Sequence, residues 1–298
     1  MTTAVRAEDK TMAPADFGLM ATAAGVWGAS FLFTEIALDA FEPSLITLFR
    51  IGFGAAAIAV FFGSARARIP RSVWPRLALL GLLWMAFPLS MFPIAQQWIN
   101  SSVAGMLNSG MPIMTVLVGT AVFGARPRTV QLLGVLVGLV GIVLIGLPTA
   151  STDGTTALGV GLVVLAVVSY GFAINLAVPL QQEFGSGPVL LHAQLFALVF
   201  VLPLGLIAVP ESSFAWDALA ANVALGAGGT GVAYFAMASL AGSVGAVRAS
   251  VVTYLIPVVS TALGLLLLDE TVAAWAILGT AVVLFGAWLT TRSGELVD

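Results

Sequence analysis

Two segments of the sequence carry small, polar and proline residues at matching spacing. In residues 101–119 and in residues 246–264, these residues recur at steps of four and three. Such steps place side chains on one face of a helix. The first face consists of Ser101, Gly105, Asn108, Pro112, Thr115 and Gly119, and the second of Ala246, Ser250, Thr253, Pro257, Ser260 and Gly264. Close packing between helices explains small residues of this kind as well as a ligand site does.

Asn108 and Thr253 hold the same position in the two faces, four residues before a proline. Proline has no N–H to donate to the carbonyl four residues back, and it bends the helix. We therefore predict that Pro112 and Pro257 bend their helices. Asn108 and Thr253 then each offer a side chain and an unpaired carbonyl in mid-helix, which a bound solute could use together. We predict that both bind a substrate.

Further candidates for substrate binding lie in the middle of other apolar runs. These candidates are Trp27, Ser30, Trp84, Tyr170 and Tyr234. Trp and Tyr at the ends of a span mark the membrane interface, but these residues lie well inside their runs. Packing against lipid or within the core is the alternative explanation. If they line one cavity, they suit a solute with an apolar or aromatic part and polar atoms at one end.

Glu35 and Arg50 are ionisable residues inside apolar runs. Charge within the membrane is rare and suggests a function. The two residues could form a structural ion pair between the first two helices. Alternatively, Arg50 could attract a carboxylate and Glu35 could take up a proton.

The composition shows which surroundings these residues need. Of the 298 residues, 60% are hydrophobic and only 8% are charged, which leaves too few polar side chains to cover a water-facing surface. The chain has no cysteine, one histidine and no Walker loop. We therefore expect no cofactor, no metal, no ATP hydrolysis and no catalysis. The expected partners are a small-molecule substrate and the lipid bilayer, with no nucleic acid, and we expect a monomer.

A helix needs about 20 mostly apolar residues to cross the hydrocarbon core. Ten runs meet this requirement, so the sequence predicts an all-α integral membrane protein with ten transmembrane helices. The runs are 17–38, 44–62, 75–95, 102–123, 130–147, 158–178, 188–209, 216–240, 245–268 and 273–290.

Cationic side chains are retained on the cytoplasmic side, so their distribution indicates orientation. With the N-terminus inside, ten of the eleven Lys and Arg residues fall in cytoplasmic segments, and the eleventh is Arg50. Adding or removing one helix would move several arginines outside. The sequence therefore predicts that both termini are cytoplasmic.

The sequence also repeats itself at an offset of 145 residues. The matched pairs are Pro43 with Pro188, Gly81 with Gly226, Pro112 with Pro257, Gly119 with Gly264, Gly134 with Gly279 and Gly141 with Gly286. Since each half has five helices, the second half enters the membrane from the opposite side, and the repeats are inverted. Inverted repeats are common in secondary transporters. The predicted organisation is a polar tail (1–16), a first five-helix repeat (17–147), a linker (148–157), a second five-helix repeat (158–290) and a C-terminal tail (291–298).

The segment from Val26 to Phe31 resembles the Trp-Gly-x-x-Phe opening of the drug/metabolite transporter superfamily, in its EamA-type members with ten helices in two units. The segments 108–141 and 253–286 are similar to the closing part of that unit. Glu270 matches its helix-terminal Glu, whereas Ala125 stands at this position in the first half.

This resemblance implies a secondary transporter of the bacterial inner membrane that exports amino acids, including aromatic or other neutral ones, or related metabolites, as YddG-type exporters do. Transport of small drugs, nucleosides or sugar phosphates, a passive channel and a non-transporting membrane scaffold are the alternatives.

Overall fold

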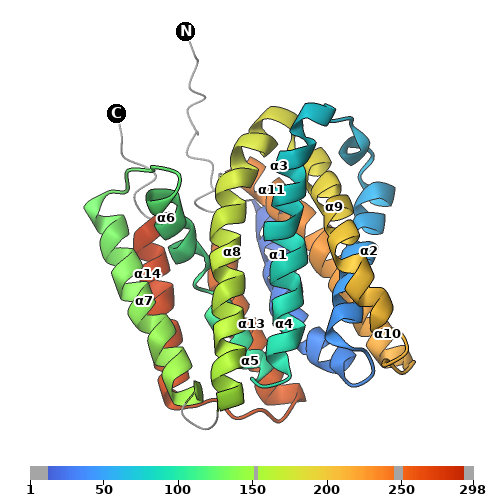
Figure 1. The fold of residues 1–298 in the computed structure, drawn as a ribbon. Coiled ribbons are helices and arrows are strands. Elements are labelled where there is room, and N and C mark those ends of the chain that lie inside the picture. Colours follow the sequence, from blue (N-terminus) through green and yellow to red (C-terminus); the bar gives the residue numbers. More distant parts are fainter. Residues whose placement is uncertain (1–12, 151–153, 245–250, 292–298) are drawn as a thin grey trace.

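The structure is a computed structural model that describes residues 13–150, 154–244 and 251–291. Within these residues the chain forms helices and no strand. Most of the helices run along one common direction as a bundle (Figure 1). The α-helices are α1 (Pro14–Leu38), α2 (Pro43–Phe61), α3 (Trp74–Gly81), α4 (Phe87–Gln96), α5 (Ser101–Asn108), α6 (Met111–Ala121), α7 (Thr129–Ala150), α8 (Gly154–Phe184), α9 (Ser186–Ile207), α10 (Trp216–Val223), α11 (Ala233–Val244), α13 (Val251–Leu267) and α14 (Ala274–Thr291).

Seven helical stretches of the described chain are long and apolar enough to cross a membrane. The bent pair α5 and α6 makes an eighth, and α13 and α14 are apolar but shorter. The predicted all-helical membrane architecture is confirmed, and the number of ten spans stays a prediction. The predicted N-terminal and C-terminal tails and the start of the predicted span 245–268 lie mostly outside the described residues.

The predicted span 158–178 is too short, because α8 continues to Phe184. Proline disrupts a helix interior, and Pro179 follows directly after the predicted end. The helix nevertheless continues through Pro179, and its last turn carries the polar residues Gln181, Gln182 and Glu183.

Two spans contain π-helical segments, in which backbone hydrogen bonds reach one residue further than in an α-helix. The segment η3 (Leu82–Ala86) joins α3 to α4, and η4 (Ala224–Val232) joins α10 to α11. A π-helical turn shifts the faces of the helix on either side of it. The residues that follow η3 and η4 therefore point in directions that a regular helical period does not predict.

The two predicted bends differ. The span formed by α5 and α6 is bent by 41° at the break that precedes Pro112. By contrast, α13 continues as one helix through Pro257.

Helices α7 and α14 pack closely through glycines at one side of the bundle (Figure 1). A Cβ atom at Gly134 would lie 2.6 Å from the carbonyl oxygen of Gly286, and one at Gly141 would lie 2.7 Å from that of Gly279. Residue numbers rise along α7 as they fall along α14, so the two helices are antiparallel. Larger residues at these positions would force the two backbones apart.

The segments after α6 and after α13 end in turns of the same form. Gly124 and Asp269 both have positive φ, of 68° and 51°. In the first turn the N–H of Ala125 donates to the carbonyl of Gly119 at 2.9 Å, and in the second the N–H of Glu270 donates to that of Gly264 at 3.1 Å. Such left-handed turns satisfy the last carbonyls of a helix.

Candidate functional site

A cavity of about 390 Å³ lies between the helices, and its wall is mostly apolar. This volume suits a small organic ligand. Helices from both halves of the chain, the first being α1 and the last α13, contribute residues to the wall. The lining residues are Trp27, Ser30, Phe31, Thr34, Arg50, Trp84, Leu89, Phe92, Asn108, Met111, Tyr170, Ile174, Val178, Gln181, Ser186, Thr230, Tyr234, Met237, Thr253 and Ile256.

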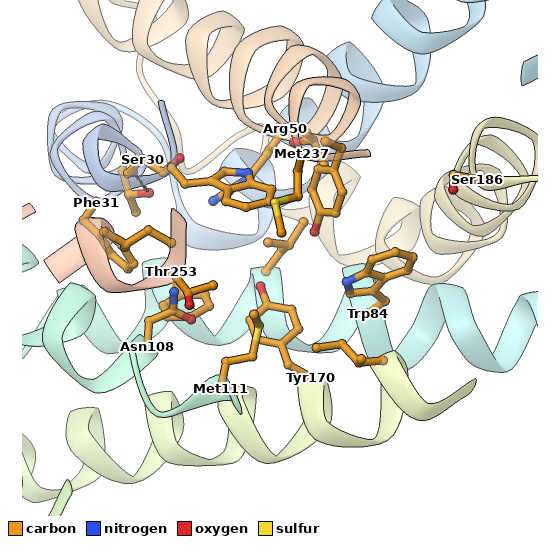
Figure 2. A pocket seen from close by; sticks show the side chains of 18 of the residues that line it. Ser30, Phe31, Arg50, Trp84, Asn108, Met111, Tyr170, Ser186, Met237 and Thr253 are labelled. Carbon is orange, nitrogen blue, oxygen red and sulfur yellow. Dashed lines mark hydrogen bonds between the residues drawn. The ribbon is translucent and has the colours of Figure 1, made fainter. Parts of the chain in front are cut away.

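The structure brings together every residue that the sequence singled out for substrate binding. All seven line this one cavity: Trp27, Ser30, Trp84, Asn108, Tyr170, Tyr234 and Thr253. Asn108 and Thr253 come from α5 and α13 and point into the same space, which Trp84 and Tyr170 also face (Figure 2). That these residues bind a solute stays a prediction.

Aromatic rings form much of the wall. The ring of Tyr234 lies edge-on to the rings of Trp27 and Trp84, with centroids 5.3 and 5.5 Å away. Phe92 contacts Phe31 edge-on at 5.6 Å and stacks on Tyr170 at 6.2 Å. Contacts of this geometry hold rings in fixed orientations, so the cavity has a defined apolar surface.

The π-helical segment η4 fixes one of these rings. The indole Nε1 of Trp27 donates a hydrogen bond of 2.9 Å to the carbonyl of Gly229, within η4. Gln194, on α9, donates from Nε2 to the carbonyl of Thr230 at 3.0 Å. Side-chain donors from two other helices thus bind carbonyls of η4. Its distorted backbone thereby becomes part of the cavity wall.

The polar groups of the wall are few. Ser30 and Thr34 donate their hydroxyl protons to carbonyls of their own helix, those of Val26 and Ser30. Their oxygens can still accept a hydrogen bond. Asn108 has a buried Oδ1 without a hydrogen-bond partner among the described residues. Because Pro112 lacks an N–H, it cannot donate to the Asn108 carbonyl.

Arg50 lines the cavity from α2 and is only 9% exposed. Its Nε is buried and has no hydrogen-bond partner within residues 13–150, 154–244 and 251–291. A Cβ atom at Gly229 would lie 3.7 Å from one of its terminal nitrogens, so the guanidinium lies against η4. The cavity therefore contains a buried cationic group beside the backbone that holds Trp27.

Glu35 does not pair with Arg50 in this structure. Its carboxylate instead accepts a hydrogen bond of 3.2 Å from Nε2 of Gln96, which also donates to the carbonyl of Phe31 at 2.9 Å. Glu35 is also absent from the residues that line the cavity. The sequence suggested that the two charges could pair, but it could not show that Gln96, the last residue of α4, reaches Glu35 on α1.

Glu270, which follows α13, binds the first residues of α5. Its carboxylate accepts hydrogen bonds from the backbone N–H groups of Ser101 at 2.7 Å and Ser102 at 3.0 Å, and from the Ser102 hydroxyl. Asn100 also donates to the carbonyl of Thr271 at 3.3 Å. We call this group the Glu270 latch, because it fastens the turn after α13 to the start of α5.

Small residues on the two faces predicted from the sequence serve helix packing. Gly105 lies against Ser260, and Gly264 lies against Ser102 and Glu270. The packing explanation therefore holds for these glycines. Asn108 and Thr253 differ from them, since both line the cavity.

The model of the EamA-like transporter family matches this chain twice, over residues 17–147 and 157–292. The chain belongs to the EamA-like transporter family. This family is part of the drug/metabolite transporter superfamily. The EamA-like chain is therefore a membrane transporter, as its helical architecture also indicates.

Several curated relatives span almost the whole of this EamA-like chain. The uncharacterized transporter YdfC of Bacillus subtilis is 25% identical over 273 residues, which are 89% of this chain and 87% of the relative. A probable terminal-alkyne amino-acid exporter of Streptantibioticus cattleyicolor is 24% identical, with 89% and 90% covered. The uncharacterized inner membrane transporter YedA of Escherichia coli is 23% identical, with 92% and 90% covered.

The solved structures agree on the fold. A chain of one crystal structure is 20% identical to this EamA-like transporter and superposes on it with a TM-score of 0.64. The match covers 94% of this chain and 98% of the other. The relatives are named as transporters and not as enzymes. With its several apolar helices, the protein is a multi-pass protein of the bacterial inner membrane.

Proposed function

We propose that this transporter is a secondary carrier that exports amino acids, including aromatic or other neutral ones, or related small metabolites, by alternating access. The observation that carries the proposal is the cavity of about 390 Å³, which has aromatic walls and a few polar groups. Both segments that match the family contribute residues to it. One relative is named as an amino-acid exporter, which favours this solute class. A YddG-like subtype is part of the same proposal.

The proposed architecture is ten spans in two five-helix repeats, 17–147 and 158–290. The two matches to one family model support a duplication. The left-handed turns at Gly124 and Asp269 support it too, because they are 145 residues apart and have the same hydrogen-bond pattern. The π-helical segments η3 and η4 also lie at corresponding positions of the two repeats.

Opposite orientation of the repeats is supported by the contact between α7 and α14, which are the fifth helices of the proposed units. Gly134 approaches Gly286, and Gly141 approaches Gly279. Gly134 thus contacts the repeat equivalent of Gly141, and Gly141 contacts the repeat equivalent of Gly134. The two helices are antiparallel. A two-fold axis in the membrane plane produces this arrangement, and such an axis lets the halves exchange roles.

The orientation and the state of the carrier follow from its two ends. The connections α2–α3 and α6–α7 carry arginines and lie at the same end of the bundle, the upper end in Figure 1. We assign this end, with both termini, to the cytoplasm. Gln181 and Ser186, near the α8–α9 turn at this end, line the cavity. The Glu270 latch lies at the opposite end, so the proposed state is open to the cytoplasm.

Counterflow in proteoliposomes tests the proposal. Purified protein is screened with labelled amino acids, with and without an imposed pH gradient. We expect saturable, stereoselective exchange by the wild type and its loss in Asn108→Leu and Thr253→Leu, because each substitution replaces a polar group of the cavity wall with a larger apolar side chain. Val140→Leu is the control, since Val140 is exposed on α7 and does not line the cavity. Unaltered exchange by both cavity variants would remove these residues from the site.

The same assay separates the alternatives. A passive channel gives flux that neither saturates nor distinguishes enantiomers. Exchange of nucleosides, sugar phosphates or small drugs in place of amino acids changes the solute class and keeps the carrier. Absence of flux with every class tested supports a non-transporting membrane protein.

A further inference from the structure

Arg50 is a charged residue that has no counter-charge among the described residues of the cavity wall. It is only 9% exposed, and its Nε has no hydrogen-bond partner in the part of the chain that the structure describes. Among the described residues that line the cavity, it is the one with a formal charge at neutral pH. Glu35, the acidic residue that the sequence suggested as its partner, binds Gln96 instead.

A buried cation of this kind needs an anionic partner, because a charge removed from water without compensation is strongly unfavourable. The guanidinium group presents several N–H donors in one plane and matches the two oxygens of a carboxylate. A single cation neutralises a single negative charge. A monocarboxylate therefore matches Arg50 better than a phosphate monoester, which carries nearly two charges at neutral pH.

The rest of the wall suits an apolar body attached to that carboxylate. Trp27, Trp84 and Tyr234 form a connected aromatic cluster. Trp27 is tied to Gly229, the residue beside which the Arg50 guanidinium lies. A solute whose carboxylate binds Arg50 would therefore place its apolar part against these rings. Aromatic side chains bind such groups through large areas of contact.

The cavity offers no comparable group for an ammonium ion. None of the described lining residues is an aspartate or a glutamate. Neutral hydroxyls, such as that of Ser30, and aromatic faces can contact an ammonium group, but they do not neutralise it, whereas Arg50 repels it.

We propose that Arg50 binds the carboxylate of the transported solute, and that the transporter accepts aromatic monocarboxylates whether or not they carry an amino group. This inference rests on the proposed function, since it names the solute class of the same cavity. The feature recognised is an anionic head on an apolar body, of which a neutral amino acid is one example.

Three probes with the same aromatic skeleton test the inference. L-Phenylalanine has both charged groups, 3-phenylpropanoate has only the carboxylate, and 2-phenylethylamine has only the ammonium. Binding to the detergent-purified protein is measured by tryptophan fluorescence and by the ligand-dependent rise in Tm, without reference to flux. We expect dissociation constants within about threefold for the two carboxylates and at least tenfold weaker binding of the amine.

The variants are Arg50→Gln, which removes the charge, and Arg50→Lys, which keeps the charge and loses the planar fork. We expect Arg50→Gln to weaken both carboxylates by about 10- to 100-fold, as loss of charge-assisted hydrogen bonds predicts, and Arg50→Lys to weaken them less. Arg50→Gln should also bind 2-phenylethylamine more tightly than the wild type, because a repulsive charge is removed. A purely structural role of Arg50 would not produce this reversal.

The outcomes separate the inference from the proposed function. Equal binding of the carboxylates by wild type and folded Arg50→Gln overturns the inference, even if amino acids are transported. Failure of the wild type to bind either carboxylate, or binding of the amine as tightly as the acid, also overturns it. If the carboxylates bind through Arg50 but no solute crosses the membrane, the inference stands and the carrier function fails. Gel filtration confirms the fold of Arg50→Gln, and Arg50→Lys provides the test if that variant does not fold.

Discussion

The Glu270 latch predicts how the conformational equilibrium of the proposed carrier can be changed. Its carboxylate accepts hydrogen bonds from the N–H groups of Ser101 and Ser102 and from the Ser102 hydroxyl. Opening the cavity at this end requires α5 to separate from the turn after α13. Glu270→Gln keeps the size of the side chain but removes its charge and one acceptor oxygen. We therefore expect this variant to favour the state open at the latch end.

The magnitude follows from these contacts. A hydrogen bond to a charged group contributes about 1.5–3 kcal/mol when buried. A negative charge at a helix N-terminus contributes about 0.3–1 kcal/mol at an exposed site. Glu270 is half-buried and the glutamine keeps one acceptor, so we take about 1–2 kcal/mol for the loss. Since about 1.4 kcal/mol corresponds to a factor of ten, the ratio of the two states should change by about 5- to 30-fold.

Spin labels can measure this ratio, because the chain has no cysteine of its own. One label is attached at Glu211→Cys and the other at Thr271→Cys, both exposed positions. Both lie at the latch end, since Ser213 binds the carbonyl of Ala40 after α1 and Thr271 binds Asn100. Double electron–electron resonance spectroscopy gives the distribution of distances between the two labels. Glu270→Gln should increase the population at the longer distance.

Asp269→Asn is the matched control. It removes a carboxylate from the adjacent residue, which is exposed and has positive φ that asparagine tolerates. We expect this variant to keep the distance distribution of the wild type. If Glu270→Gln also keeps it, or if both variants change it equally, the latch does not control the opening of this end.

Two further predictions concern packing and the cavity wall. Gly286→Ala should lower Tm in detergent, because its Cβ atom would lie 2.5 Å from the backbone nitrogen of Gly138. Gly25→Ala is the control and should keep or raise Tm, since a Cβ atom there would have nothing within 4 Å. Equal effects of the two variants on Tm would show that α7 and α14 tolerate separation. Trp27→Phe should weaken solute binding about threefold to tenfold, since it loses the hydrogen bond to Gly229 that orients the ring, with a net value of about 1 kcal/mol. Binding is measured by titration, and an unchanged affinity would exclude Trp27 from the site.

Much of the helical architecture could be predicted from the sequence, because an apolar run of about 20 residues has few alternatives to a membrane helix. The site residues could be selected for a related reason. Polar and aromatic side chains in mid-span, such as Asn108 and Tyr170, are unfavourable or unusual against lipid. They therefore tend to face the interior of the bundle, and all seven selected residues line one cavity.

Other parts of the site depend on contacts that a single sequence does not reveal. Thr230 lies in η4, where the π-helical turn breaks the helical period that would place it on a face. Gln96 and Glu270 each bind a segment far away in the sequence. The absence of a partner for Arg50 among the described residues depends on the positions of all its neighbours, and the suggested pairing with Glu35 used only their expected depth in the first two helices.

The latch has no chemical equivalent in the first half of the chain, since the residue that follows the turn there is Ala125, which has no acceptor. The two ends of the protein are thus unequal. Without solute, the proposed carrier would populate the state closed at the latch end more than the state closed at the other end. Such a bias does not change the final ratio of solute concentrations across the membrane, which is set by the gradients that drive transport. It lowers the apparent affinity on the side whose gate must first be released, because only a fraction of the molecules is ready to bind there. In the proposed carrier, a single glutamate would thus give the two sides of the membrane different apparent affinities for the same solute.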